Sequence, residues 1–184
     1  MRRAMTSAVA VPDSEWRLFF ADVQLLECEK GSTLFAQGQP VECVFFLLQG
    51  MVRYFAVDAR REVTFGFDYE GLFCSDFEGW FGRKPAAKTA EALEDIRAFA
   101  LPRHAFEEAF ARDLRWDRVA RVIQESLLQR LADKERRIRM LTAKQRYLLL
   151  LEQGSPLATR LPQYHLASYL GVTPETLSRI RSRI

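Results

Sequence analysis

Short hydrophobic runs separated by glycine occupy the first half of the chain. They are rich in β-branched and aromatic residues and read STLFAQG, CVFFLLQG, MVRYFAV and REVTFGF, with Gly38, Gly50, Gly66 and Gly71 at or near their ends. Short strands with a turn signal every ~8–12 residues are typical of an all-β barrel or sandwich. The later run AKTAEALEDIRAFALP predicts two more strands with a break near residues 93–95, and a short helix over about 14–21 precedes the set. The expected core includes Leu34, Phe46, Leu48, Val52 and Phe65.

The hydrophobic period changes after Phe106. Between about residues 113 and 139, apolar residues recur mostly at spacings of three and four, which predicts an amphipathic helix of roughly seven turns. These residues are Trp116, Val119, Val122, Ile123, Leu127, Leu128, Leu131 and Ile138. One small β domain cannot cover so long a stripe. We therefore expect part of it to form a seam with a second copy of the chain; the alternative is a helix packed wholly within the monomer.

The last quarter of the chain predicts a small helical module. A helix over about 143–153 is stopped by Gly154 and Pro156, and two short helices follow on either side of Gly171. Glycine readily takes the left-handed conformation that ends a helix, while Thr173 suits the cap of the next helix and Pro174 its first position. Leu166, Ala167, Leu170, Leu177 and Ile180 form a shared apolar face. Two helices joined by a glycine turn around an apolar centre indicate a helix-turn-helix.

Charge is distributed unevenly along the chain. The 184 residues carry a net charge of +3. Residues 140–184 contain six Lys or Arg and two Glu, so this part carries +4 and residues 1–139 carry −1. A basic excess at one end suggests a surface that faces a polyanion such as DNA. The alternative is an ordinary solvated basic helix face.

The final helix offers side chains suited to contact with DNA bases. In a helix-turn-helix the second helix enters the major groove with its N-terminal residues toward the bases. Glu175 and Arg179 lie four residues apart on one helix face, and they suit a G·C step because arginine donates two bonds to guanine and a carboxylate accepts from cytosine. The expected DNA contacts are Thr173, Glu175, Thr176, Ser178, Arg179 and Arg183. The alternatives are a plain salt bridge, or a basic helix that binds an acidic protein.

Composition favours a folded cytoplasmic protein with no membrane partner. Hydrophobic residues make up 48% of the chain, which is ample for a core, yet no apolar run approaches the ~20 residues that cross a bilayer. The residues before Pro12 contain no adequate apolar leader. Cys28, Cys43 and Cys74 are scattered and odd in number, which is a poor basis for disulfides.

With these features the chain resembles the Crp/Fnr family of bacterial transcription regulators, named after the cyclic-AMP receptor and the fumarate–nitrate regulator. The segment KGSTLFAQGQPVECVFFLLQGMVRYF resembles the opening of that family's β-roll, and ASYLGVTPETLSRIR resembles its helix-turn-helix signature. The resemblance implies an α+β fold, with an antiparallel jelly-roll sensor domain over 1–112, a dimerisation helix over 113–139 and a helix-turn-helix DNA-binding domain over 140–184. It also implies a cytoplasmic homodimer that binds two-fold sites in double-stranded DNA, with RNA polymerase as a further partner, and it places the base-reading positions at Glu175 and Arg179.

The chain also departs from the family pattern. Pro174 stands where many members have an arginine before the reading glutamate, and we expect the wing that follows the reading helix to be short or absent. Ligand-binding members carry a Gly-Glu pair for the ribose and an Arg-Ser/Thr pair for the cyclic phosphate. The resemblance maps these pairs onto Ser75 and Asp76, and onto Lys88 and Thr89. Aspartate is shorter than glutamate, and lysine lacks the planar fork of arginine. We therefore expect an effector other than cyclic AMP, or none; a cyclic-nucleotide-responsive regulator is the alternative.

Catalytic or metal chemistry finds little support in the sequence. An iron–sulfur cluster usually takes four cysteines, and this chain has three without close spacing. Iron or zinc in a β-roll needs two or three histidines and a carboxylate, whereas His104 is the single histidine of that part, with haem as its alternative role. No phosphate-binding loop, G-x-S-x-G motif or triad spacing occurs. We predict a protein that is not an enzyme and holds no metal; a thiol sensor would need an exposed cysteine with a lowered pKa.

Overall fold

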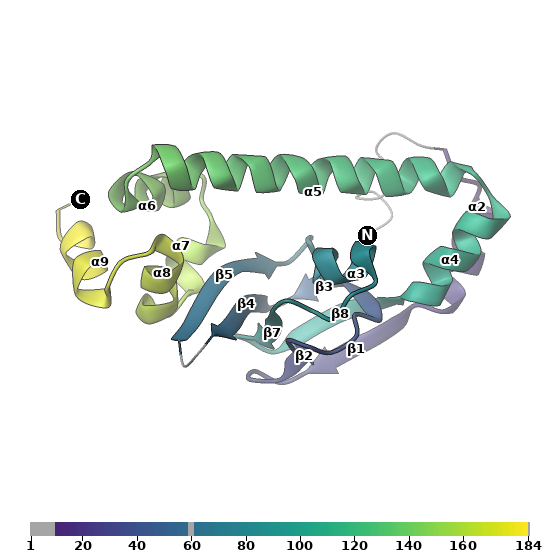
Figure 1. Cartoon of the computed structure of the whole chain (residues 1–184), viewed down its shortest axis with the longest axis horizontal. Coiled ribbons are helices and arrows are strands. Elements are labelled where there is room, and N and C mark those ends of the chain that lie inside the picture. Colours follow the sequence, from purple (N-terminus) through teal and green to yellow (C-terminus); the bar gives the residue numbers. More distant parts are fainter. Residues whose placement is uncertain (1–9, 59–60, 184) are drawn as a thin grey trace.

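The structure, a computed structural model, describes residues 10–58 and 61–183. The segment on which the expectation of no leader rests therefore lies largely outside the described residues, as does Ile184. Figure 1 shows a β-roll beneath one long helix, with a group of short helices at one end of that helix and α2 and α4 at the other.

Two four-stranded antiparallel sheets, in the orders β1-β8-β3-β6 and β2-β7-β4-β5, form the roll. The roll and its flanking helices comprise α2 (Asp13–Ala21), β1 (Gln24–Cys28), β2 (Thr33–Phe35), β3 (Cys43–Gln49), β4 (Met51–Asp58), β5 (Arg61–Tyr69), β6 (Phe73–Cys74), α3 (Phe77–Gly82), β7 (Thr89–Ala92), β8 (Ile96–Pro102) and α4 (Arg103–Arg112). Leu47, Val52 and Ala98 are fully buried between the sheets. The predicted β-roll is confirmed, including the break between β7 and β8.

Gly50 makes the predicted tight turn between β3 and β4. Its φ of 93° lies in the left-handed region, and a Cβ there would stand 2.4 Å from the carbonyl oxygen of Asp95. Glycine alone fits because every other residue would collide with the backbone.

Two predicted core residues are wrong. Phe46 and Val52 are buried, but Leu48 is 38% exposed and Phe65 is 46% exposed. The β3–β8 register shifts between Leu47/Ala98 and Gln49/Arg97, so Leu48 is the extra residue of a bulge and lies outside the regular alternation of β3. The β4–β5 register shifts between Tyr54/Gly66 and Phe55/Thr64. Phe65 is therefore the extra residue of a bulge, where alternation along β5 is interrupted.

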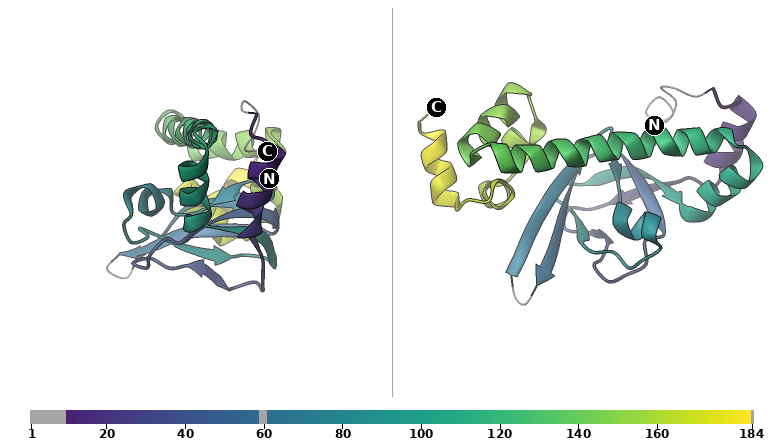
Figure 2. Two further views of the ribbon diagram at one scale, coloured as in Figure 1. Left: turned by 90° about the vertical axis from the view of Figure 1, so that its right-hand side faces the viewer. Right: turned by 45° about the horizontal axis from the view of Figure 1, so that its top comes forward.

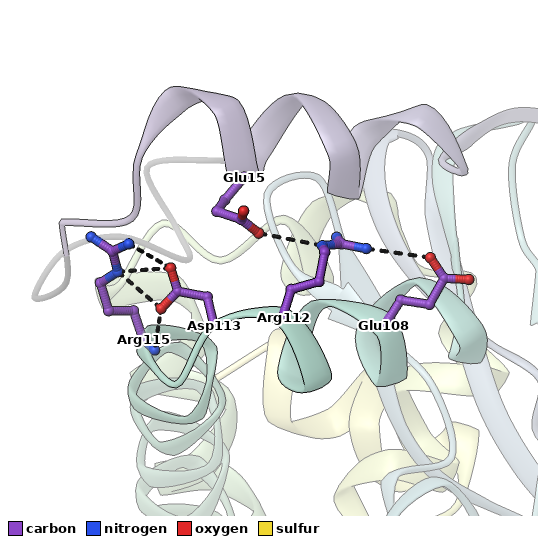
Figure 3. A network of polar contacts seen from close by, with 5 residues as sticks. All are labelled: Glu15, Glu108, Arg112, Asp113 and Arg115. Carbon is purple, nitrogen blue, oxygen red and sulfur yellow. Dashed lines mark hydrogen bonds and ion pairs between the residues drawn. The ribbon is translucent and has the colours of Figure 1, made fainter.

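An aromatic core joins the roll to the start of α5 (Arg115–Met140). Trp16 and Phe19 of α2 pack on Trp116, with ring centroids 4.7 and 4.8 Å from that of Trp116. Figure 3 shows the ion pairs at the rim of this core. Arg112 bridges Glu15 of α2, at 3.4 Å, and Glu108 of α4, at 3.3 Å. The start of α5 is thus fixed to the roll.

The two halves of α5 differ in burial. Trp116 and Val119 are 0% and 2% exposed, whereas Leu128, Leu131 and Ile138 are 68%, 63% and 52% exposed. The predicted long amphipathic helix is confirmed with its bounds shifted by one or two residues. Its second half leaves the apolar stripe uncovered within one chain. No described helix is long and apolar enough to span a membrane.

The C-terminal module contains one helix more than the sequence pattern predicts. It comprises α6 (Ala143–Glu152), α7 (Pro156–Arg160), α8 (Gln163–Leu170) and α9 (Pro174–Arg181). Pro156 ends the preceding helix, as expected, but also occupies the first turn of α7, which Ser155 caps. The short helices α3 and α4 are likewise absent from the sequence-based prediction. Figure 1 and the right-hand view of Figure 2 place α6–α9 at the far end of α5 from α2.

Contacts with β4 and β5 hold the helical module against the roll. Met51 and Phe67 share one buried cluster with Leu166 and Leu177 of the module. The Phe67 and Tyr169 rings meet edge-on at 5.5 Å. Arg160 of α7 strengthens this contact, because its guanidinium donates hydrogen bonds to Glu70 and to Glu94 of the roll.

Candidate functional site

The turn between α8 and α9 has the local structure that its sequence predicts. Gly171 has a φ of 67° and ends α8 in the left-handed conformation. Thr173 then caps α9, because its Oγ1 accepts the backbone N–H of Thr176 at 3.2 Å, and Pro174 takes the first helical position. The turn fixes the direction in which α9 leaves the module.

One face of α9 is buried and the other is exposed. Leu177 is 0% exposed and packs into the cluster formed by Leu166 and Leu170 of α8. Ile180 packs at the edge of the same cluster. Of the residues expected to contact DNA, Thr173, Glu175, Ser178, Arg179 and Arg183 are exposed, and Thr176 is half-buried. The polar face of α9 is therefore open to a partner.

The charged groups of α9 do not neutralise each other directly. Arg179 Nη2 donates to Thr176 Oγ1 at 3.1 Å, and within the described part of the chain it forms no ion pair with Glu175. A hydrogen bond from the Thr173 side chain lowers the pKa of Glu175, and the charge of Arg179 lowers it further. Glu175 is thus an ionised acceptor at neutral pH. The plain salt-bridge alternative is absent here.

The first two residues of α8 add a surface that the sequence analysis did not include. Gln163 Nε2 donates to the carbonyl oxygen of Pro174 at 2.9 Å, and Tyr164 is 60% exposed. They line a shallow depression together with Pro174, Glu175, Ser178 and Arg179. The bond from Gln163 shows that the start of α8 lies against the start of α9. This contact depends on the angle at which the two helices cross, for which residue spacing along the chain carries no signal.

Three basic residues of the module make contacts within the chain. Arg146 Nη2 donates to the carbonyl oxygen of Leu170 at 2.8 Å, and Arg181 Nε donates to Tyr147 Oη at 3.1 Å. Arg160 is held by the roll. Arg146 is half-buried, whereas the other five basic residues of the described module remain exposed: Lys144, Arg160, Arg179, Arg181 and Arg183. The basic surface of the module therefore includes residues whose charged groups are already engaged by the protein, such as Arg160.

The positions that the family pattern assigns to the ribose serve the fold. Asp76 is 0% exposed and caps α3: Oδ1 accepts the N–H of Gly79 at 3.0 Å, and Oδ2 accepts the N–H of Ala87 at 2.8 Å. Ser75 Oγ donates to the carbonyl oxygen of Cys43 at 3.1 Å. Both carboxylate oxygens of Asp76 are therefore occupied by backbone donors.

The positions that it assigns to the phosphate are also engaged. Thr89 Oγ1 accepts the N–H of Gln37 at 3.0 Å, and the Lys88 ammonium lies 5.0 Å from the centre of the Tyr54 ring. Tyr54 Oη donates to Asp68 at 2.6 Å, and burial raises the pKa of Tyr54 well above its ordinary value. Each of the four mapped side chains thus makes a contact within the chain.

Buried polar groups connect this part of the roll to α5. Asp68 is 6% exposed, and its Oδ1 accepts from Arg130 of α5 at 2.7 Å. The Lys134 ammonium donates to the carbonyl oxygen of Phe65 on β5. Burial lowers the pKa of Lys134, and the nearby charge of Lys88 adds to this effect. These bonds tie β5 to the middle of the long helix.

The cysteines and histidines do not gather into a reactive site. Burial raises the pKa of Cys28, Cys43 and Cys74, the reverse of what an activated thiol requires. His104 is exposed, and its Nε2 lies 3.9 Å from Asp22. Within residues 10–58 and 61–183, no group of three His, Cys, Asp or Glu side chains is arranged to hold a metal ion.

Comparisons with known proteins show what this architecture is similar to. Residues 25–113 match the family model of the cyclic nucleotide-binding domain. FixK2 from Bradyrhizobium japonicum is 23% identical, with 88% of this chain and 83% of that chain covered at a TM-score of 0.74. The catabolite activator protein of Thermus thermophilus is also 23% identical, with 98% and 85% covered at a TM-score of 0.60. A protein from Eubacterium rectale assigned to the Crp/Fnr family of transcriptional regulators is 15% identical, with 94% and 83% covered at 0.71.

The chain has the Crp/Fnr fold. The resemblance drawn from the sequence is confirmed at this level, because roll, long helix and terminal helices all align with regulators of that type. No curated protein sequence gives a significant match. The roll, the long helix and the terminal helices thus each have a counterpart in this fold. The function has to be inferred from the residues that this chain carries there.

Proposed function

We propose that this chain is a DNA-binding transcription regulator of the Crp/Fnr type. In this proposal it acts as a homodimer, it inserts α9 into the major groove of a two-fold operator, and it responds to an effector other than cyclic AMP. The observation that carries the proposal is the exposed polar face of α9. Glu175, Ser178 and Arg179 are open to solvent on a helix whose opposite side is anchored by the buried Leu177.

The geometry of α9 supports the reading of bases near its start. Thr173 and Pro174 hold the helix N-terminus in place, and a helix N-terminus also favours a phosphate of the DNA backbone. Arg179 is the donor for guanine and Glu175 the acceptor for cytosine. Arg183 and Lys144, both exposed, contact phosphates and so add affinity without sequence preference.

The uncovered half of α5 supports the dimer. Leu128, Leu131 and Ile138 are each more than half exposed, on a helix that buries Trp116 and Val119 in its first half. An antiparallel or parallel pairing with α5 of a second copy buries this stripe. Two copies then present two α9 helices, which match operator half-sites one helical turn apart, about 34 Å.

The contacts within the roll support an effector other than cyclic AMP. Asp76 is occupied by two backbone N–H groups, and Thr89 accepts a third. A bound cyclic nucleotide would have to displace these bonds. An effector that favours one arrangement of the dimer by about 1–3 kcal/mol is sufficient for regulation. From the resemblance to this family we further predict that the chain is a regulator and not an enzyme. We also predict that it lies in the cytoplasm and contacts RNA polymerase.

Selection of bound sequences from a random duplex library, at two salt concentrations, tests the DNA proposal. We expect the purified chain to enrich a palindrome, with affinity that falls steeply as salt rises. The variant Arg179→Ala should lose about 1–3 kcal/mol of binding free energy and relax one base position, whereas Arg183→Ala should weaken all sequences evenly. Failure to enrich any sequence, with and without candidate effectors, would favour the alternative of a basic helix that binds an acidic protein.

The dimer is tested separately by Leu131→Asp, which places a charge in the uncovered stripe of α5. We expect sedimentation to show a dimer for the unmodified chain and a monomer for this variant, because a buried unpaired charge is strongly unfavourable. Its free energy of unfolding as a monomer should change by less than about 0.5 kcal/mol, since Leu131 is exposed in the single chain. A variant that stays dimeric would exclude this seam.

A further inference from the structure

A cavity of about 320 Å³ lies at the junction between the roll and the helical module. Its size falls at the lower end of the range for small-molecule sites, about 300–1,000 Å³. Three strands, two loops and α8 contribute to its wall, through Lys30, Gly31, Arg53, Phe55, Glu62, Glu91, Ala92, Leu93, Tyr164 and His165. None of these residues belongs to the positions that the family pattern maps onto the nucleotide.

A buried arginine organises the acidic side of the cavity. Arg53 is 5% exposed, and its Nε and Nη2 both donate to Thr64 Oγ1, at 3.0 and 2.8 Å. It also pairs with Glu62, and with Glu91 at 3.5 Å, and its guanidinium lies 4.6 Å from the centre of the Phe55 ring. Arg53 thus holds the two carboxylates near each other, and its own N–H groups are engaged by side chains of the protein.

The two carboxylates keep accepting capacity for a ligand. The side chains of Glu62 and Glu91 are 49% and 32% exposed, so each has oxygen surface that Arg53 does not cover. A carboxylate has about four acceptor positions. Two adjacent carboxylates with spare positions suit a ligand group with several N–H donors and a positive charge, such as an ammonium.

A second basic residue of the wall, Lys30, lies beside the strand that carries Glu91, because the N–H of Gly31 donates to the carbonyl oxygen of Ala92 at 2.8 Å. Lys30 is exposed, and its backbone N–H donates to Asp95 at 2.9 Å, which fixes the loop while the ammonium stays available. With His165 neutral, the ionised groups of the wall balance: Arg53 and Lys30 against Glu62 and Glu91. A ligand with a single net charge would disturb this balance, and a zwitterion would not.

The rest of the wall is largely apolar and aromatic. Phe55 and Leu93 come from the roll, and the Tyr164 and His165 rings lie together with centroids 3.9 Å apart on α8. His165 is 4% exposed, and its Nδ1 has no hydrogen-bond partner among the described residues. A buried polar atom of this kind gains from a ligand donor or acceptor.

We propose that this cavity binds a free α-amino acid with an apolar side chain. Its ammonium lies at Glu62 and Glu91, its carboxylate at Lys30, and its side chain against Phe55 and Tyr164. The inference rests on the proposed function, because the amino acid is then the effector of the regulator. It contacts the roll and α8 together, so its binding biases the position of the module that carries α9.

Isothermal titration calorimetry on the full chain, with L-leucine, L-phenylalanine and L-tyrosine as probes, tests the chemistry. We expect at least one of the three to bind. Phenethylamine and 3-phenylpropanoate keep the ring of phenylalanine and lack its carboxylate or its ammonium, respectively. Each analogue should bind at least about tenfold more weakly, because one charged end is unpaired. Absence of binding for all three amino acids overturns the proposal, as does an analogue that binds as well as its parent.

Three variants locate the site. Glu62→Gln and Lys30→Ala should each raise the dissociation constant about tenfold, since each removes one charged partner. Glu29→Gln, an exposed carboxylate beside Lys30 and outside the cavity wall, should leave it unchanged. Binding that survives both Glu62→Gln and Lys30→Ala places the ligand elsewhere and overturns the proposal.

Operator binding separates this inference from the function on which it rests. We expect the amino acid to shift the affinity for the selected palindrome at least threefold in the unmodified chain, and to shift it little in Lys30→Ala. Operator binding without any response to the amino acid overturns the effector and leaves the regulator intact. Amino-acid binding in calorimetry without any selected DNA supports the cavity and contradicts the regulator.

Discussion

On the polar face of α9, Glu175 and Arg179 are exposed and share no ion pair within the described part of the chain, whereas at the start of α3 Asp76 is fully buried and accepts two backbone N–H groups. Both helices begin with a residue that caps the backbone, Thr173 in one and Asp76 in the other. In α9 the capping residue is separate from the expected contact residues, so these stay free. In α3 the capping residue is itself the expected ligand contact. Asp76 therefore has a role in the fold, and a ligand contact at this position stays a prediction.

The largest expected effect tests that difference directly, through Asp76→Ala and Glu175→Ala. Asp76→Ala leaves the N–H groups of Gly79 and Ala87 without their acceptor in a buried place, so the free energy of unfolding should fall by about 2–4 kcal/mol. Glu175→Ala should change it by less than about 0.5 kcal/mol, because its side chain is exposed. Urea denaturation followed by tryptophan fluorescence measures both.

Asp76→Asn is the matched control, because it keeps one acceptor oxygen and loses the other. We expect an intermediate loss, about half of that for alanine. If Asp76→Ala proved as mild as Glu175→Ala, Asp76 would not be essential to the fold. The mapping of a ligand contact onto it would then regain support.

The sequence predicts the elements of this fold better than the faces of their residues. Glycine turns and hydrophobic periods identify the β-roll, α5 and the α8–α9 pair. They fail at Phe65, because a bulge in β5 breaks the alternation on which the prediction depends. They also miss α7, since Pro156 ends one helix and begins the next, and a pattern that treats proline as a stop reports only the first role.

The sequence likewise predicts some features of the candidate site and misses others. Helix period alone places Glu175 and Arg179 opposite Leu177, so their exposure is predictable from residues 173–183. The engagement of Asp76 with Ala87 depends on a contact between segments eleven residues apart, and the inward turn of Arg160 depends on Glu70, ninety residues away. Contacts of that range are set by the tertiary structure, and local spacing carries no signal for them.

The exposed face of α9 also depends on the junction between the roll and the module, because α9 keeps its orientation only while α8 stays in place. Burial lowers the pKa of His165 in α8 to about 4. The unfolded chain, with an ordinary pKa near 6.5, therefore binds more protons between pH 6.5 and 4, and stability falls as the pH is lowered through that window. By pH 4 the loss from this group should reach up to about 3 kcal/mol.

His165→Gln removes the titrating group and keeps hydrogen-bonding capacity. Its unfolding free energy should therefore fall less steeply than that of the unmodified chain between pH 6.5 and 4, as measured by urea denaturation at several pH values. His104→Gln is the matched control, because His104 is exposed. Equal slopes for His165→Gln and the unmodified chain would mean that α8 is already released from the roll in that range.

The smallest expected effect concerns the ion pairs that hold the same junction. Arg160 donates to Glu70 at 2.8 Å and to Glu94, and hydrogen bonding to Arg160 lowers the pKa of Glu70 to about 2. Because these groups are partly exposed, Arg160→Ala should cost only about 1 kcal/mol of unfolding free energy at pH 7.

The carboxylate of Glu70 contributes stability above its ordinary pKa of 4.5 and loses it as the pH falls toward 2. The difference between Arg160→Ala and the unmodified chain should therefore shrink across that window. Arg160→Lys, which keeps the charge and loses the fork, should fall between the two. A difference that stayed constant down to pH 2 would show that packing around Phe67 and Tyr169, and not the ion pairs, holds α8 and hence α9 on the roll.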